Sequence, residues 1–233
     1  MSKLVRPIAI ILMGLGLAVM AIGAVTMQKA NDGLASLDAV YAAQNVTLSY
    51  NDAGELVDRG ETEGAQAILA LLEDDWQYPV NHADLDATDP LVNTPTELMY
   101  QYAVISYHTL NATQTVTLEE DAEFNGEMFP AGTYEVEVDG RYWTDFDREH
   151  PLDGQVREMA WTGTAHGLLG SIAAGVNADY QAGFAHFSGW RTILVGFAIG
   201  LAGAGLLSLS LQRREEQVEE EAQARIKELA TVS

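Results

Sequence analysis

The sequence has no cysteine and little positive charge. Its 233 residues include 12 lysines and arginines against 34 aspartates and glutamates, and the formal net charge is −22. Without cysteine, no disulfide can stabilise a domain that is exported to an oxidising compartment, so a hydrophobic core has to do so. The acidic excess disfavours binding to nucleic acid and to anionic lipid head groups, because both are polyanions.

The motifs of common catalytic sites are also missing. The chain contains no Gly-x-Ser-x-Gly nucleophile elbow, no phosphate-binding glycine loop and no His-Glu-x-x-His zinc motif. Its five histidines are scattered, and pairs of acidic residues carry little information in a chain this acidic. We therefore expect a protein that is not an enzyme, with no catalytic residues and no cofactor.

Charged residues are absent from two apolar stretches, residues 7–27 and 192–212. Each is about 20 residues long, which at roughly 1.5 Å per residue matches a bilayer core of about 30 Å. We predict transmembrane helices over residues 7–27 and 191–212, and hence a lipid bilayer as the first partner. A cleaved signal peptide is the alternative for the first stretch, but the apolar run there is longer than the usual signal core.

Basic residues near the ends of the two stretches predict the orientation, since such residues are retained on the cytoplasmic side. Two precede the first stretch, two follow the second, and one lies at each opposite end. They are Lys3, Arg6, Arg213, Arg214, Lys29 and Arg191. Residues 1–6 and a charged helical tail, residues 213–233, are therefore expected in the cytoplasm, so that both termini are cytoplasmic. Residues 28–190 are expected outside the cell membrane.

The predicted outer segment, residues 28–190, is strongly acidic, with five basic residues against 28 of the 34 acidic ones. Such acidity keeps an exported domain soluble, which is the favoured interpretation. It also attracts cations. At about 160 residues, the segment is long enough to bury a core of its own.

Apolar residues in the outer segment change between a helical and a two-residue period, which predicts an α+β domain with several helices and a small antiparallel sheet. The fold class is therefore a membrane protein with two transmembrane helices flanking an extracytoplasmic α+β domain. Helices are expected near residues 31–41, 62–73 and 96–110, and from residue 153 without a break into the second span. Strands are expected at residues 46–50, 55–57, 115–118 and 133–138, with a short hairpin over 122–129.

The best metal-like pattern is an acidic loop that contains His82, Asp84, Asp86 and Asp89. Closely spaced oxygen ligands suit a hard cation such as calcium. The loop departs from the EF-hand pattern, because Asp89 stands where glycine is required and Pro95 where the bidentate glutamate belongs. A solvated acidic loop without a metal is therefore the favoured interpretation.

Aromatic residues alternate with arginine and aspartate in residues 140–154. The candidate contact residues are Tyr142, Trp143, Phe146 and Arg148. They either seal the joint between the sheet and the following helix or form an exposed contact site. The structural joint is the favoured interpretation.

Two phrases carry a resemblance to known sequences: Phe146-Asp147-Arg148-Glu149-His150-Pro151-Leu152, which is followed by a small-residue helix and a terminal apolar run, and Tyr102-Ala103-Val104-Ile105-Ser106-Tyr107-His108-Thr109-Leu110. The chain resembles a group of uncharacterised two-span membrane proteins from actinobacteria. A label of aromatic ring-opening dioxygenase is often attached to that group. This sequence gives the label no support, because a non-haem iron site needs clustered histidine and carboxylate ligands. The resemblance implies a two-span topology and no activity.

Small residues in the second span predict a helix contact. Gly196 and Gly200 are four residues apart, and Ala204 continues the stripe. In lipid, close backbone approach between small residues is a main source of helix association. Gly14 and Ala18 have matching spacing in the first span, so either the two spans pack within one chain or the second span pairs between chains. Chance occurrence of glycine is the alternative.

These observations favour a non-enzymatic, membrane-anchored accessory or interaction protein that presents its acidic outer domain to a membrane protein partner or to a second copy. The alternative is a membrane sensor that couples an outer cation or ligand to the cytoplasmic tail. A pore or transporter subunit is least favoured, because neither apolar stretch, residues 7–27 or 192–212, contains an ionisable residue.

Overall fold

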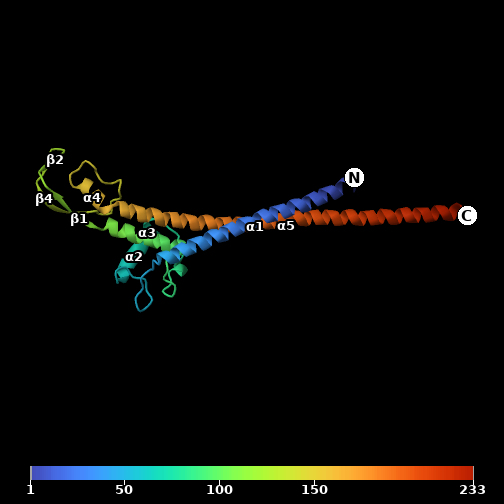
Figure 1. Ribbon diagram of the computed structural model, residues 1–233, viewed down its shortest axis with the longest axis horizontal. Coiled ribbons are helices and arrows are strands. Elements are labelled where there is room, and N and C mark those ends of the chain that lie inside the picture. The colour runs from blue at the N-terminus through green and yellow to red at the C-terminus, as the bar shows by residue number, and fades with distance from the viewer. Residues whose placement is uncertain (1, 233) are drawn as a thin grey trace. The chain divides into compact units, whose positions relative to one another are not determined.

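The computed structural model describes residues 2–232, and the side chains of residues 4–227. Helices, two strand pairs and connecting loops make up the chain (Figure 1). It divides into two compact units: Ser36–Tyr180, here the folded unit, and the flanking segments Met1–Ala35 and Gln181–Ser233, which together are the helical unit. The predicted α+β composition, with two long apolar helices and small antiparallel strand pairs, is confirmed.

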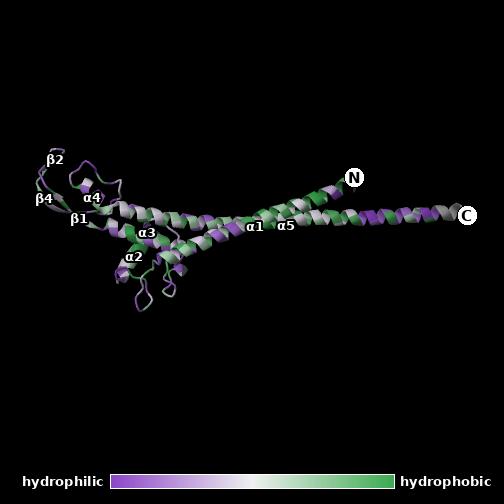
Figure 2. Cartoon of the chain, in the orientation of Figure 1, coloured by the Kyte–Doolittle hydropathy of each residue, from purple (hydrophilic) through white to green (hydrophobic). Residues whose placement is uncertain are grey.

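Two long helices, α1 (Ser2–Gln44) and α5 (Gly163–Val232), contribute to both units. Each contains a stretch that is long and apolar enough to cross a membrane, with a mean hydropathy of 2.6 in α1 and 2.1 in α5. Figure 2 shows these stretches in green and the polar end of α5 in purple. Large side chains on both helices are exposed, including Ile11, Phe197 and Leu201.

α1 continues through Asn31, Asp32 and Gly33, where the sequence predicted that a new helix begins. Poor helix formers cost only about 0.5–1 kcal/mol each in a helix interior, and tertiary packing overrides such costs. Ala30 and Tyr41, on either side of this segment, are both 5% exposed. The packed residues on both sides therefore keep the helix continuous.

In the helical unit, α1 and α5 are antiparallel and in backbone contact. A Cβ atom added to Gly16 would lie 2.6 Å from the carbonyl oxygen of Gly196. One added to Gly23 would lie 2.7 Å from the carbonyl oxygen of Gly189. No side chain fits in so little space, so glycine is what allows the two backbones to approach.

This glycine contact repeats every seven residues. It includes Ala9, Gly16 and Gly23 on α1, and Gly189, Gly196 and Gly203 on α5. A seven-residue repeat keeps two helices in contact along a left-handed crossing, whereas the Gly-x-x-x-Gly motif produces a right-handed one. The three positions on α1 extend over about 21 Å, most of the thickness of a bilayer core.

The glycine contact differs from the four-residue stripe expected from the sequence. Gly196 lies within the contact, and the backbone of Gly200 touches the Cβ position of Gly16. A Cβ atom on Gly200 itself would meet nothing within 4 Å, and the same holds for Gly14. Ala204 is exposed. In a left-handed helix pair, residues seven apart stay in the contact between the helices, whereas residues four apart rotate out of it. The contact therefore follows the seven-residue set.

The helices of the folded unit surround its first core. α2 (Thr62–Ala70) continues directly into the π-helical turn η1 (Leu71–Asp75), and the 3-10 turn η2 (His82–Asp84) lies in the loop that follows. Ile68 and Leu72 are fully buried and pack in one cluster with residues of α1, α3 and α5. This cluster joins segments that are far apart in the sequence.

α3 (Pro95–Leu110) begins with a reciprocal capping box. The Thr94 hydroxyl accepts a hydrogen bond of 3.3 Å from the backbone N–H of Glu97, and the Glu97 carboxylate accepts one of 2.9 Å from the backbone N–H of Thr94. Both groups are otherwise unpaired at a helix start. The helix begins one residue before the range 96–110 that the sequence predicted.

Two antiparallel strand pairs follow α3. β1 (Thr113–Leu118) pairs with β4 (Gly132–Glu137), and β2 (Ala122–Phe124) pairs with β3 (Glu127–Phe129). Alternate residues of β1 point inwards, and Val116 is only 1% exposed. The two-residue period therefore predicted these strands with small errors at their ends.

α4 (Asp153–Ala160) is separate from α5, although the sequence predicted one continuous helix. Trp161 interrupts the helix, with φ −99° and ψ 63°, and is only 5% exposed. Its indole N–H donates a hydrogen bond of 3.1 Å to the backbone carbonyl of Arg141. The burial of this ring and its hydrogen bond offset the loss of helical continuity. Thr162 then caps α5 by accepting a bond from the N–H of Ala165.

Candidate functional site

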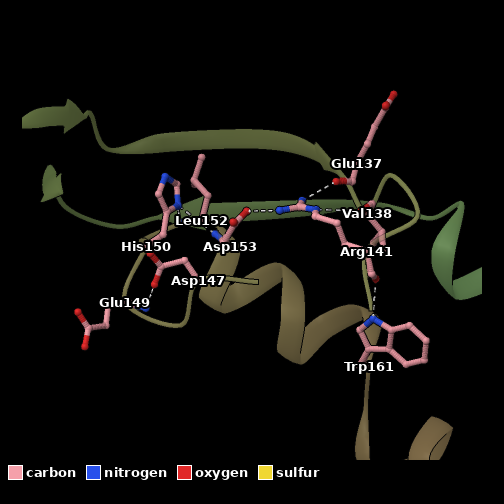
Figure 3. A network of polar contacts seen from close by, with 9 residues as sticks. All are labelled: Glu137, Val138, Arg141, Asp147, Glu149, His150, Leu152, Asp153 and Trp161. Carbon is pink, nitrogen blue, oxygen red and sulfur yellow. Dashed lines mark hydrogen bonds and ion pairs between the residues drawn. The ribbon is translucent and has the colours of Figure 1, made fainter. Parts of the chain in front are cut away.

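Arg141 fixes the segment between β4 and α4. Its guanidinium donates to the backbone carbonyls of Glu137 and Val138, at 2.9 and 3.0 Å. It also forms an ion pair of 2.9 Å with the carboxylate of Asp153 at the start of α4 (Figure 3). The carbonyl of Arg141 accepts the bond from Trp161. The side chain of Arg141 therefore links the end of β4 to α4, and its backbone carbonyl holds the residue that follows α4.

The phrase that carries the actinobacterial resemblance forms the turn before α4. The ring nitrogen Nδ1 of His150 accepts bonds from the backbone N–H groups of Leu152 and Asp153, at 3.2 Å each (Figure 3). The carboxylate of Asp147 accepts one of 3.0 Å from the N–H of Glu149. The two bonds to His150 pair N–H groups at the start of α4, where a helix leaves its first N–H groups without backbone partners. In the structure this segment therefore caps the start of α4.

Tyr142 lies in an aromatic cluster beside this joint. Its hydroxyl oxygen accepts a hydrogen bond of 3.1 Å from the indole N–H of Trp76. Its ring stacks on Trp161, with 5.8 Å between ring centres and 24° between planes. Trp76 in turn makes an edge-to-face contact with Tyr102, with 5.7 Å between ring centres and 78° between planes. Although Trp161 stacks on its ring, Tyr142 is 40% exposed and lines a cavity.

An open cavity of about 700 Å³, here the acidic pocket, lies next to Tyr142. The lining of this cavity contains charged, polar and aromatic residues: Asp74, Asp75, Trp76, Tyr107, Asn111 and Tyr142. The helical segments that end at Asp75 and at Leu110 both reach it, and the C-terminal end of a helix carries partial negative charge. No lining residue is basic. The acidic pocket therefore favours positive charge.

The π-helical turn η1 helps to set the walls of the acidic pocket. The N–H of Trp76 donates to the carbonyl of Leu71 at 3.1 Å, a spacing of five residues instead of four. The widened turn rotates the residues that follow relative to a regular α-helix. Asp74, Asp75 and Trp76 consequently line the same cavity. The sequence predicted that the helix ends at these aspartates, but nothing in it signals the cavity.

A second, more apolar cavity of about 420 Å³, here the aromatic pocket, also borders Tyr142. Its walls include Trp143, Trp161, His166 and Leu169. The ring centres of His166 and Trp143 lie 4.9 Å apart in an edge-to-face arrangement. The Nδ1 atom of His166 lies 3.1 Å from the carbonyl oxygen of Thr162, the cap residue of α5. His166 is thus one of the residues that line the aromatic pocket.

The four predicted contact residues lie in two environments. Phe146 is 6% exposed and belongs to the core under the joint. Trp143 is half-buried, and the guanidinium carbon of Arg157 lies 3.0 Å from its ring centre. Tyr142 and Arg148 are exposed. The segment is therefore a structural joint that leaves Tyr142 accessible at a cavity.

The acidic loop does not bring its four candidate ligands together. His82 Nε2 lies 2.8 Å from the carboxylate of Glu73. Asp84 and Asp86 accept hydrogen bonds from neighbours in the loop, at 2.6 and 2.8 Å, and Asp89 is exposed. Among residues 4–227, no group of three or more histidine or acidic side chains is arranged to hold a metal ion.

Two carboxyl groups of the folded unit, one buried and one partly buried, lie outside the linings of both pockets. Glu97 is 1% exposed, and burial raises its pKa although it accepts bonds from the N–H groups of Asn93 and Thr94. The carboxylate of Asp179 accepts a bond of 2.7 Å from the Tyr41 hydroxyl, and burial raises its pKa as well. Both groups contribute to the stability of the unit at low pH.

No family model matches the chain, and no curated protein or solved structure is significantly similar to it.

Proposed function

We propose that this chain is a non-enzymatic interaction protein of the cell membrane, anchored by α1 and α5, with both termini in the cytoplasm and an acidic outer domain that meets a partner. The partner is a membrane protein or a second copy of the chain. The resemblance to actinobacterial two-span proteins belongs to this proposal and concerns its topology.

The observation that carries the proposal is the way α1 and α5 meet. The contact between them consists of glycine and alanine, while large apolar side chains such as Ile10, Ile22 and Leu194 are exposed. In water, each such side chain forgoes about 1.5–3 kcal/mol of burial free energy. In a bilayer it is already in an apolar solvent, and the helices associate through backbone contact.

The aromatic cluster supports the proposal that the chain is an interaction protein. Tyr142 is exposed at the acidic pocket, yet its hydroxyl and one ring face are held by Trp76 and Trp161. Rigid, half-exposed aromatic residues are typical of the centres of protein interfaces. The folded unit thus offers a preformed contact point.

A sensor is the second candidate function, and the continuity of α5 favours it. α5 has no break between Gly163 and Val232. Near its start, His166 and Ala173 line the aromatic pocket. A ligand in the aromatic pocket that displaced the first turns of α5 would act on the same helix that forms the charged tail, because an unbroken helix is stiff along its axis.

Extraction and copurification test these functions. The full chain should stay with membranes during alkaline carbonate washing and should then copurify in mild detergent with one partner in fixed stoichiometry, or as an oligomer by light scattering. Release by carbonate would contradict the membrane anchor. A monomer without a partner, whose tail changes its protease sensitivity when a small ligand binds, would replace the interaction function with the sensor.

A further inference from the structure

We infer that the acidic pocket receives a basic side chain, lysine or arginine, of the partner protein; this inference rests on the proposed function and names the chemistry of its contact. The cavity combines negative charge with aromatic walls.

Charge in the acidic pocket has one sign. Asp74 and Asp75 are both exposed in its lining, and within the side chains described neither takes part in an ion pair. Two helix C-termini add negative potential from their last carbonyl groups. A concave wall concentrates such a field, so an anion is repelled and a cation is attracted.

Aromatic rings supply the second element of cation recognition. Trp76 and Tyr142 line the acidic pocket and are joined edge to edge by the 3.1 Å hydrogen bond between them. Tyr107 contributes a third ring. A cation over the face of tryptophan or tyrosine is attracted by the ring quadrupole, and the methylene groups of a lysine or arginine also bury apolar surface against the ring.

The position of these rings is fixed before any partner arrives. Trp161 supports Tyr142 by stacking, and Tyr102 supports Trp76 through an edge contact. Rings that are already ordered lose little conformational entropy on binding, which favours affinity. At about 700 Å³ the cavity admits one basic side chain together with the backbone that carries it.

The alternatives fit the acidic pocket less well. A bare metal ion needs several converging oxygen ligands, and among the side chains of residues 4–227 no group of three or more histidine or acidic residues is arranged to hold one. A neutral apolar group has a better place in the aromatic pocket, whose walls include Trp143, Trp161 and Leu169. A basic side chain uses both the carboxylates and the rings of the acidic pocket.

Fluorine NMR of the full chain in detergent tests this inference. The four tryptophans are labelled as 5-fluorotryptophan, and the Trp76 signal is assigned with Trp76→Phe. The probes are the peptide Ac-Gly-Lys-Gly-amide and its norleucine analogue, which has the same length without the charge. We expect the lysine peptide to shift the Trp76 signal in a saturable way, and the norleucine peptide to shift it at least about tenfold less at equal concentration.

Charge variants provide the matched control. Asp74→Asn with Asp75→Asn should weaken lysine-peptide binding about fivefold or more, because both carboxylates of the pocket are neutralised. Glu119→Gln with Glu120→Gln removes the same charge from an exposed turn and should leave the affinity unchanged. Equal shifts from both peptides, no shift from either, or equal weakening by both double variants would overturn the inference.

The partner separates this inference from the proposed function. If a partner copurifies equally well with wild type and with the Asp74→Asn, Asp75→Asn variant, the interaction function stands and the pocket assignment fails. If no partner or oligomer exists while lysine-peptide binding is saturable and charge-dependent, the interaction function fails and a partner protein is excluded as the source of the side chain, although the pocket does bind a basic group.

Discussion

The carbonyl oxygen of Gly16 lies 2.6 Å from the point where a side chain of Gly196 would begin. A side chain at position 196 must therefore separate the two helices, at a cost of about 1–3 kcal/mol for overpacking. We expect Gly196→Leu to increase the distance between spin labels attached at Ile11→Cys and Leu201→Cys, measured by pulsed electron paramagnetic resonance. The chain has no cysteine of its own, so the labels are specific.

Gly200→Leu is the matched control for that experiment. Gly200 is one turn further along α5, but its Cβ position is open. The label distance should therefore stay as in wild type. If Gly200→Leu separates the helices and Gly196→Leu does not, the four-residue stripe predicted from the sequence is the true contact and the seven-residue contact is wrong.

Arg141→Lys should destabilise the folded unit by about 1–3 kcal/mol, since a lysine cannot reproduce three directed bonds from one planar group. The bonds at risk go to Glu137, Val138 and Asp153. Thermal denaturation of the full chain, followed by near-ultraviolet circular dichroism, measures the loss. Arg148→Lys makes the same chemical change at an exposed position and should have little effect. Equal melting temperatures for the two variants would show that the joint does not depend on Arg141.

Glu97→Gln should make the folded unit less sensitive to pH. Burial raises the pKa of Glu97 above its ordinary value of 4.5, so the folded state binds this proton more tightly than the unfolded state does. The stabilisation from that proton is complete below pH 4.5 and is lost as the pH rises through the raised pKa. The melting temperature of Glu97→Gln, relative to wild type, should consequently increase as the pH rises from about 4 to about 7.

Glu119→Gln serves as the control for the pH experiment, because it removes a carboxylate from an exposed turn. Its melting temperature relative to wild type should change little over the same pH range. A Glu97→Gln difference that stays flat, or that falls with pH, would mean that the buried carboxyl is not held in the environment described.

Local patterns in the sequence predicted much of the folded unit. Alternation in residues 115–118 and 133–138 predicted β1 and β4, because a strand with one wet face reveals its period directly. The helical spacing of residues 62–73 and 96–110 predicted α2 and α3 for the same reason. The break at Trp161 was missed, since it depends on a hydrogen bond to the carbonyl of Arg141, 20 residues away.

The candidate site was harder to predict than the fold. Tyr142 and Trp143 stood out because aromatic residues rarely gather in an acidic surface segment, and both border cavities in the structure. Asp74, Trp76 and Tyr107 come from other elements, and nothing local in the sequence says that they meet Tyr142. The seven-residue spacing of Gly189, Gly196 and Gly203 is present in the sequence. The four-residue motif is present in the same helix, and spacing alone does not decide which of the two makes the contact.

Reporter fusions test the central claim, a membrane-anchored chain with its acidic domain outside, most directly. Alkaline phosphatase, which is active only outside the cytoplasm, is inserted after Asn93 in one fusion and placed after Ser233 in another. The account predicts activity for the first fusion and none for the second, with a fluorescent protein that folds in the cytoplasm giving the opposite pattern. Phosphatase activity only at the second position, or a soluble active product from the first, would contradict it.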